Sequence, residues 1–332
     1  MKIDFKVAGL GDAWMRLMAL STLARIRPSE RHVVYPPAVL VPLARRVFEG
    51  FFDVETSGPA DIEMSHLGLR HLLPGMLRGK RYYSPFYWIL RETRTALTIK
   101  DKINDLGFLV AVATTRLSRP RRGYVYAYQG FMEMQGLRPF RDVTLKEYLS
   151  QAQIDFDTIH SRVCEEFGSK SPRQRTVVFP SGAAHQIMPP EFAAKFLSFA
   201  DFAFHEKDSF SKEYERAGLN VVRFGNPPEE ICELIASASA VYCTDSFPSH
   251  LAQMWEDRTT VLLTEMKAGT TVHPGFPASR VVASRAECHP CRHLTRTSPD
   301  HRCTAGRMFC MTWDNSEYIA HISSFTSSIK SA

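Results

Sequence analysis

Four residues near the start of the chain combine a flexible backbone with a carboxylate. Gly9-Leu10-Gly11-Asp12 follow a predicted strand over residues 3–7 and precede apolar residues at helical spacing. Glycines permit a tight turn and a close approach to a ligand, and ligands in open α/β sheets bind at the carboxyl ends of the strands. Asp12 could therefore act as a general base on a hydroxyl group. The simpler interpretation is that Asp12 caps the helix that follows it.

A second polar group lies in the other half of the chain, within the segment VYCTDSFPSH (241–250). Its polar residues, Asp245, Ser246, Ser249 and His250, collect where a predicted strand gives way to a helix. Backbone amides, hydroxyls and an imidazole at such a point can bind a diphosphate. A capped helix with an incidental histidine is the alternative.

Four of the seven cysteines lie close together near the C-terminal end, and they are Cys288, Cys291, Cys303 and Cys310. Their C-x2-C-x11-C-x6-C spacing can place four thiolates around one tetrahedral ion, either Zn²⁺ or Fe. Because four protein ligands close such a site, the ion would be structural. Reduced free thiols are the alternative. The other cysteines fall in helix or strand patterns and are expected in the core, and they are Cys164, Cys232 and Cys243.

The composition indicates a soluble protein of two domains. The chain has 332 residues, with 44% hydrophobic and 23% charged residues, and it contains no run of about 20 apolar residues. Because its start lacks the pattern of a signal peptide, we expect a cytoplasmic protein. The net charge of +6 fits an anionic partner such as a nucleotide diphosphate or a lipid headgroup, and nucleic acid is not expected. The basic and aromatic stretch 66–94 could lie at the inner face of a membrane.

Strand and helix patterns alternate in both halves of the chain. Short β-branched runs such as 176–179 and 260–263 are separated by helical patterns, which is typical of parallel, doubly wound sheets. The polar stretch 165–175 is the expected linker. We therefore expect an α/β fold with one domain in 1–165 and a second in 172–314.

Three segments together resemble the glycosyltransferase family that contains the bacterial lipopolysaccharide heptosyltransferases. KVAGLGDAWMRLMALSTL is similar to the family's opening strand, turn and helix. ASAVYCTDSFPSHLAQMWEDRTTVLL is similar to its donor-site motif, and VVFPSGAAHQIMPPEFAAKF to the start of its second domain. The three matches occur in the family's order. The resemblance covers residues 1–55 and most of the second half, but not 60–150.

The resemblance implies the GT-B fold, in which two Rossmann-like domains face each other across a cleft. It also implies an inverting transfer of a heptose-like sugar from a donor such as ADP-heptose to an acceptor hydroxyl. Asp12 would be the base, Glu206 would bind the donor ribose, and no catalytic metal would be needed. The implied donor-binding residues are Gly11, Ser181, Gly182, Glu206, Asp245, Ser246, Ser249 and His250. A helix within 315–332 would pack back on the first domain, and the cysteine segment 288–310 would belong to the second.

Several positions depart from the family's pattern. Phe247, followed by Pro248, stands where the family has a glycine, and Met188 replaces a tryptophan. His185 or Gln186 occupies the place of an expected basic residue. A phenylalanine does not adopt a positive φ cheaply, so either the loop or its phosphate contact must differ.

The acceptor stays open at this stage, with a glycan, a lipid-linked saccharide and a protein hydroxyl as the candidates. In the branch of the family that adds heptose to autotransporter proteins, a comparable cysteine cluster holds iron. The resemblance therefore also allows a protein-modifying enzyme of that type. The altered loop at Phe247 allows a third alternative, a catalytically inactive module that binds sugar nucleotides.

Overall fold

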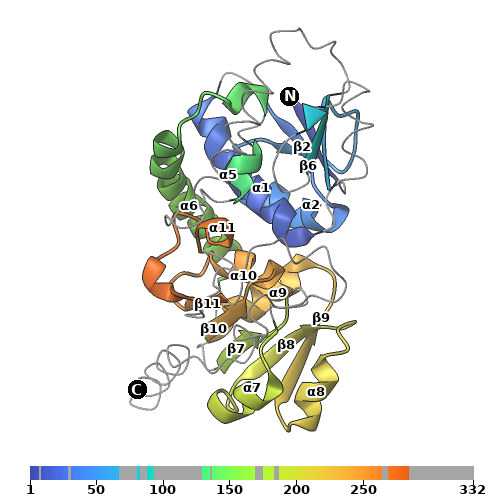
Figure 1. The fold of residues 1–332 in the computed structure, drawn as a ribbon, viewed down its shortest axis with the longest axis vertical. Coiled ribbons are helices and arrows are strands. Elements are labelled where there is room, and N and C mark those ends of the chain that lie inside the picture. The colour runs from blue at the N-terminus through green and yellow to red at the C-terminus, as the bar shows by residue number, and fades with distance from the viewer. Residues whose placement is uncertain are drawn as a thin grey trace, which may run out of the picture. The chain divides into compact units, whose positions relative to one another are not determined.

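A computed structural model of the chain describes residues 1–6, 9–28, 31–66, 81–82, 88–92, 129–134, 137–168, 175–182, 187–263 and 268–283. The chain divides into two compact units, 1–159 and 160–332, and each contains a six-stranded sheet (Figure 1). The division falls within one helix, α6 (Leu145–Phe167), shortly before the expected linker. The cysteine segment 288–310 and the expected C-terminal helix in 315–332 lie outside the described residues.

The first sheet is parallel in its first four strands and antiparallel in the last two. Its strands are β1 (Lys2–Lys6), β2 (Val33–Tyr35), β3 (Asp53–Val54), β4 (Ile62–His66), β5 (Arg81–Tyr82) and β6 (Trp88–Glu92). They lie in the order β3-β2-β1-β4-β6-β5. β6 pairs antiparallel with both β4 and β5. The sheet is therefore parallel over β3, β2, β1 and β4, as predicted, and its antiparallel edge of β6 and β5 is an addition to the predicted pattern. Antiparallel neighbours need no helical crossover, so the helix periodicity used for the prediction does not detect them.

Among the described residues of this unit, the helical segments are α1 (Leu10–Ile26), η1 (Ala38–Leu40), α2 (Val41–Val47), α5 (Gln129–Met134), η3 (Arg138–Phe140) and α6. The apolar spacing predicts an amphipathic α1, but the structure buries it on every side, including Arg16, Ser21 and Thr22. Its surroundings explain this, because α5 packs against it and Arg25 pairs with the buried Asp155 of α6 at 3.2 Å. A helix enclosed by others does not expose a polar face.

The long helix α6 begins with a capping box. The Thr144 hydroxyl accepts a hydrogen bond from the Glu147 backbone N–H at 3.2 Å, and the Thr144 N–H donates to the Glu147 carboxylate at 2.7 Å. This reciprocal pair satisfies amide groups that the first turn of a helix leaves without partners. None of the described helices is both long and apolar enough to cross a lipid bilayer.

The second sheet is parallel throughout, as the sequence predicts. Its strands are β7 (Arg175–Phe179), β8 (Asp201–His205), β9 (Asn220–Phe224), β10 (Ala238–Thr244), β11 (Thr259–Leu263) and β12 (Val281–Ala283). They lie in the order β12-β11-β10-β7-β8-β9. After β9 the chain returns to place β10 beside β7, which gives the 3-2-1-4-5-6 order of dinucleotide-binding folds. The prediction of an α/β fold with doubly wound parallel strands is confirmed for this unit.

Helices cover both faces of the second sheet, and they are α7 (Pro190–Phe196), α8 (Ser211–Arg216), α9 (Pro228–Ala236), α10 (Phe247–Ala252), α11 (Ala268–Thr271) and the short η4 (Ala278–Arg280). Phe192 of α7 and Tyr214 of α8 share one apolar core with Phe202, Phe204 and Tyr242 of the strands. Helices α9 and α10 contact each other and β10, and Figure 1 shows them on the other side of the sheet.

The described cysteines divide into two groups. Cys232 of α9 and Cys243 of β10 are buried, which confirms the prediction that they belong to the core. Cys164 of α6 is only half-buried, so the same prediction is wrong for it. Helical spacing places Cys164 on the apolar side of α6, but a position near the end of a helix is covered only where another segment reaches it.

We expect Gly130→Ala to destabilise the protein. A Cβ at Gly130 of α5 would lie 2.2 Å from the backbone carbonyl oxygen of Met15 in α1, so the two helices would have to separate. Such overpacking costs about 2 to 3 kcal/mol of unfolding free energy, which urea titration measures. Gly9→Ala is the matched control, because the added methyl would meet only the end of a flexible side chain, that of Asp12. Equal stability of the two variants would contradict this packing.

Candidate functional site

The centre of the second sheet is the point where the strand order reverses. β7 and β10 are parallel neighbours, with Phe179 opposite Cys243, and the Thr244 hydroxyl donates to the Phe179 carbonyl at 3.4 Å. From these adjacent carboxyl ends the chain continues into α7 and into α10, which contribute to opposite faces of the sheet. Open α/β sheets bind their ligands in the crevice that forms at such a point.

Residues that the sequence singles out collect at this reversal point. Ser181 and Gly182 follow β7 by two and three positions and are half-buried. Asp245 and Ser246 follow β10 directly. Because the two strands are parallel and adjacent, both pairs lie at the same edge of the sheet. The structure thus brings together two segments that are more than sixty positions apart in the sequence.

His250 lies in α10, one turn beyond Ser246, and is buried with Asp245. Its Nε2 is 4.0 Å from Asp245 Oδ1, with 5% of the His250 side chain and 7% of the Asp245 side chain exposed. Burial lowers the pKa of His250 to about 4, because the charged imidazolium is poorly solvated there. At neutral pH His250 therefore provides a hydrogen-bonding group to this edge of the sheet, not a positive charge.

The two serines of this segment bond within the turn. The Ser249 hydroxyl accepts from the Ser246 N–H at 3.2 Å and donates to the Ser246 carbonyl at 2.8 Å. The Ser246 hydroxyl donates to the Thr244 carbonyl at 3.0 Å. Capping of α10 thus accounts for both hydroxyls. Their binding to a phosphate stays a prediction, and it would require these protons to be redirected.

Phe247 and Pro248 form the first turn of α10 in a regular helical conformation. Ser246 before them is extended, with φ −160° and ψ 172°. Position 247 therefore needs no glycine, because Phe247 itself is the first residue of the helix. Helix α10 has only six residues, so its dipole contributes less to anion binding than that of a long helix.

A buried polar layer that no sequence motif indicates lies behind α10. The Gln253 side chain donates to the Ser249 and Thr271 carbonyls at 3.2 and 3.4 Å and accepts from the His273 N–H at 2.7 Å. His273 is buried, and its Nδ1 accepts from the Gly275 N–H at 3.0 Å. A glutamine inside the apolar run LAQMW was the one signal in the sequence. This layer fixes α10 against residues 271–275.

Glu206 follows β8, the strand on the other side of β7. Its backbone N–H donates to the Phe224 carbonyl of β9 at 2.9 Å, and its side chain is exposed. An acidic residue at the end of the second strand is the group that binds a ribose hydroxyl in nucleotide-binding folds of this strand order. Glu206 thus lies at the same edge of the sheet as Ser181 and Asp245.

In the first unit, Asp12 lies at the corresponding edge of the other sheet. β1 pairs parallel with both β2 and β4, and α1 begins at Leu10, so Gly11 and Asp12 belong to its first turn. Asp12 is half-buried, and its Oδ2 lies 2.8 Å from where a Cβ on Gly9 would be. A carboxylate in a first turn also interacts favourably with the helix N-terminus. Asp12 therefore occupies a position that serves a cap and a base equally well.

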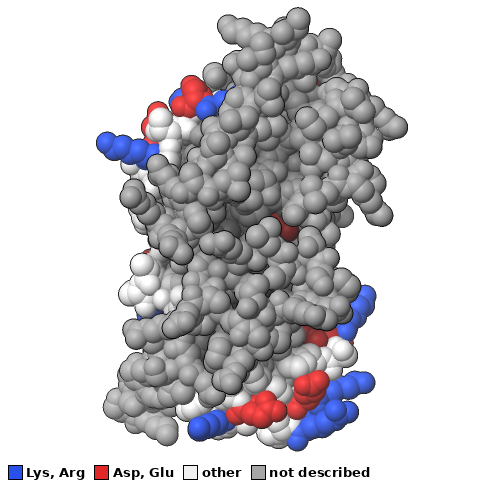
Figure 2. Space-filling view, viewed as in Figure 1, with Lys and Arg blue, Asp and Glu red and all other residues white. Residues whose placement is uncertain are grey.

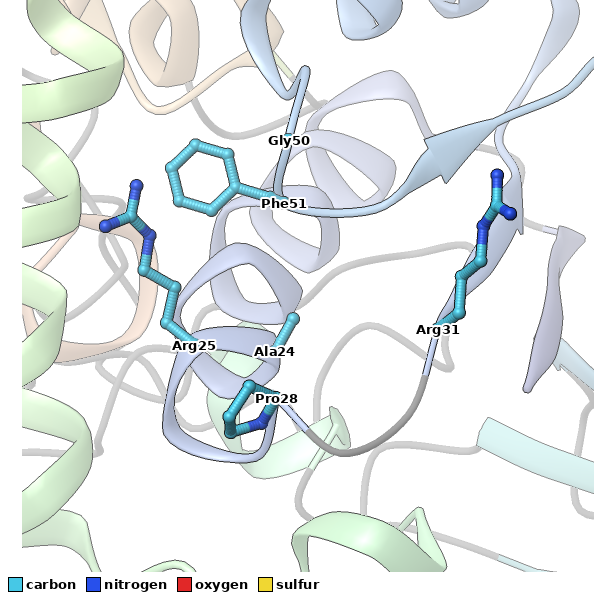
Figure 3. Close-up of a pocket in the computed structure, with 6 residues that line it drawn as sticks. All are labelled: Ala24, Arg25, Pro28, Arg31, Gly50 and Phe51. Carbon is cyan, nitrogen blue, oxygen red and sulfur yellow. The ribbon is translucent and has the colours of Figure 1, made fainter.

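One open pocket lies away from these residues. Ala24, Arg25, Pro28, Arg31, Gly50 and Phe51 line it (Figure 3). Arg31 and Phe51 precede β2 and β3, so the pocket is at the amino edge of the first sheet, whereas Asp12 is at the carboxyl edge. Arg25 is paired with Asp155 and Arg31 with Asp53, so each guanidinium has a carboxylate partner.

Basic and acidic residues alternate on the described surface. Figure 2 shows them side by side on the face that it draws, and Arg223 pairs with Glu215 at 2.6 Å.

The prediction of a metal site concerns four cysteines. Within the described ranges no three His, Cys, Asp or Glu residues are grouped so as to hold a metal ion. The predicted metal ligands Cys288, Cys291, Cys303 and Cys310 lie outside those ranges, and the metal site stays a prediction.

No family model matches the chain, and no curated protein does. Solved structures that match the chain include three glycosyltransferases. E. coli ADP-heptose LPS heptosyltransferase II shares 15% identity at a TM-score of 0.42, covering 87% of this chain and 92% of its own. E. coli heptosyltransferase WaaC with ADP shares 11% identity at a TM-score of 0.43, covering 86% of this chain and 93% of its own. A glycosyl transferase family 9 protein from Veillonella parvula shares 10% identity at a TM-score of 0.44, covering 85% of this chain and 86% of its own.

We expect the protein to lose stability in mild acid because of its two buried imidazoles. Burial lowers the pKa of His250 to about 4 and that of His273 to about 3, from 6.5. The unfolded chain therefore binds protons below pH 6.5 that the folded protein does not, and unfolding free energy falls as pH drops toward 4. The loss between pH 7 and 5 is about 2 kcal/mol for each imidazole.

Urea unfolding at pH 7, 6 and 5 measures this loss for the wild type and for His250→Gln and His273→Asn. At pH 7 each variant is expected to be less stable than the wild type, because the substitution repacks a buried site. Between pH 7 and 5 each variant should lose less unfolding free energy than the wild type, because it has one buried imidazole fewer. The same pH slope in all three proteins would show that these imidazoles are not responsible.

Proposed function

We propose that the chain is an inverting glycosyltransferase whose second unit binds a nucleotide diphosphate sugar. The observation that carries this proposal is the reversal of strand order between β7 and β10. It places polar residues from two distant segments at the edge where sheets of this order bind nucleotides. A heptose-like sugar carried by a donor such as ADP-heptose is the most specific form of the proposal, and it rests on the motif resemblance.

On the donor side, the backbone and side chains of Ser181 and Gly182 would contact the diphosphate together with Ser246, Ser249 and His250. Glu206 would bind the ribose, since its exposed carboxylate follows the second strand. His250 is uncharged at neutral pH and would donate a hydrogen bond to the leaving diphosphate. Asp245, beside His250, would orient the imidazole.

On the acceptor side, Asp12 would take the proton of an acceptor hydroxyl. The hydroxyl oxygen then forms a bond with the anomeric carbon on the face opposite the diphosphate. The bond between that carbon and the diphosphate oxygen breaks, so the configuration inverts and a nucleoside diphosphate leaves. General base catalysis contributes about 100-fold to 10,000-fold in rate. The proposal assigns no metal ion to this step, and the acceptor is a glycan, a lipid-linked saccharide or a protein hydroxyl.

We also propose a structural Zn²⁺ or Fe ion on Cys288, Cys291, Cys303 and Cys310. A set of four thiolates suits either metal, and the ion would hold together a segment with few apolar residues. Elemental analysis of the purified chain would identify it. In the proposed setting the enzyme works in the cytoplasm, at the inner face of a membrane when its acceptor is lipid-linked.

One observation favours a second candidate function. The hydroxyls of Ser246 and Ser249 are both engaged in the cap of α10, and the family's glycine is absent at Phe247. A module that binds sugar nucleotides without transferring the sugar would tolerate both features. It predicts stabilisation by a donor with no turnover on any acceptor.

We expect one class of sugar nucleotide to raise the melting temperature and to support transfer. A panel of ADP-, GDP-, UDP- and CMP-linked sugars is added at 100 times Kd, where binding contributes about 2.7 kcal/mol. Asp12→Asn should keep this thermal shift and lose at least about 100-fold in kcat, and EDTA should leave kcat unchanged. Full activity of Asp12→Asn would refute the base assignment, whereas no thermal shift with any donor would refute the binding site.

We expect Gly9→Ala to reduce turnover without unfolding the protein. The added methyl would occupy the space 2.8 Å from Asp12 Oδ2, so the carboxylate has to move, and a misplaced base costs about 100-fold in rate. The control is the same substitution in the Asp12→Asn protein, where it should cost nothing further because both changes act through one group. Equal losses in both backgrounds would show that Gly9 acts independently of Asp12.

A further inference from the structure

A cysteine and a histidine that do not belong to the donor-binding segments lie together near the end of α6. His160 and Cys164 are four positions apart, so they share one face of the helix. The Cys164 Sγ is 3.8 Å from Nδ1 and 3.9 Å from Nε2 of His160. Both residues are half-buried, so the pair is partly exposed to solvent.

A backbone carbonyl holds this pair in place. The Met254 carbonyl, which follows α10, accepts a hydrogen bond from His160 Nδ1 and lies 3.9 Å from Cys164 Sγ. This carbonyl thus orients the imidazole, and both ring nitrogens lie within 3.9 Å of the sulfur. A nucleophile beside a base that a third group orients is the usual arrangement of an activated side chain.

The charges around the pair favour a protonated imidazole. The contact with Cys164 and the bond to Met254 raise the pKa of His160 to about 9, with a smaller contribution from Glu256. His160 is therefore an imidazolium at neutral pH. A positive charge next to a cysteine favours the thiolate, which is the reactive form.

The other described cysteines differ from Cys164. Cys232 and Cys243 are buried in the core, and burial raises the pKa of the Cys243 thiol. They are therefore expected to react only when the protein unfolds.

We propose that Cys164 is a reactive thiol, activated by His160, that undergoes thiol–disulfide exchange with small disulfides. The Cys164 thiolate attacks one sulfur of the disulfide and forms a mixed disulfide. The bond between the two original sulfurs breaks, and the leaving thiolate takes its proton from His160 or from water. No electron is gained or lost overall, and the only co-reactant is the small disulfide.

The test is the rate at which glutathione disulfide modifies Cys164 in the folded full-length chain, followed by mass spectrometry of the tryptic peptide 163–170 (VCEEFGSK). We expect a rate at pH 7 about tenfold above that of His160→Gln, because an isolated thiol is only a few per cent thiolate at that pH. Gln153→Ala, an exposed neutral change on the same helix, should react as the wild type does. Protection of Cys232 and Cys243 shows that each variant is folded.

The pH profile gives a second readout that needs no variant. The wild-type rate should fall less steeply with decreasing pH than the rate of free cysteine measured under the same conditions. A profile that parallels that of free cysteine, or equal rates for the wild type and a folded His160→Gln protein, would overturn the proposal. If His160→Gln does not fold, as exposure of Cys232 would reveal, the wild-type profile alone decides.

Discussion

The second unit depends on the pairing of β10 with β7. Three strands run outward from β7 to β9, and the chain then returns to start the other half of the sheet beside its first strand. The hydrogen bond from Thr244 to the Phe179 carbonyl joins the two ends. If β10 paired with another strand than β7, the residues after β7 would be separated from those after β10. The polar groups of the site would then lie at different places along the sheet.

Hydrogen bonds of uncharged side chains hold the polar groups at this edge of the sheet. His250 is uncharged because it is buried, and Gln253 ties α10 to the segment that contains His273. Ser249 and Ser246 close the first turn of a six-residue helix. Hydrogen bonds within the turn fix these hydroxyls, so Ser246 and Ser249 would have to redirect their protons when a phosphate binds. This turn also explains how Phe247 can replace a glycine, since the helix starts at that residue.

The strands of the second unit were predictable from the sequence, because β-branched runs such as 176–179 and 260–263 stand between helical patterns and turn residues. The same pattern also predicted that the polar residues after these strands lie at the carboxyl edge of the sheet. The burial of Arg16 in α1 was not predictable, since it requires α5 and α6 to pack around that helix. Nor was the layer of Gln253 and His273, which is made by contacts between distant segments. The half-buried position of Cys164 likewise depends on Met254, ninety residues further on.

The central claim is that a nucleotide diphosphate binds where β7 and β10 end. Hydrogen–deuterium exchange of the full chain with ADP, GDP or UDP tests it most directly, because it locates the ligand without assuming a reaction. The account predicts that at least one of them slows amide exchange in residues 179–182 and 244–250, and leaves exchange at the amino edge of that sheet unchanged. Protection confined to other segments, or none with any of the three, would contradict it.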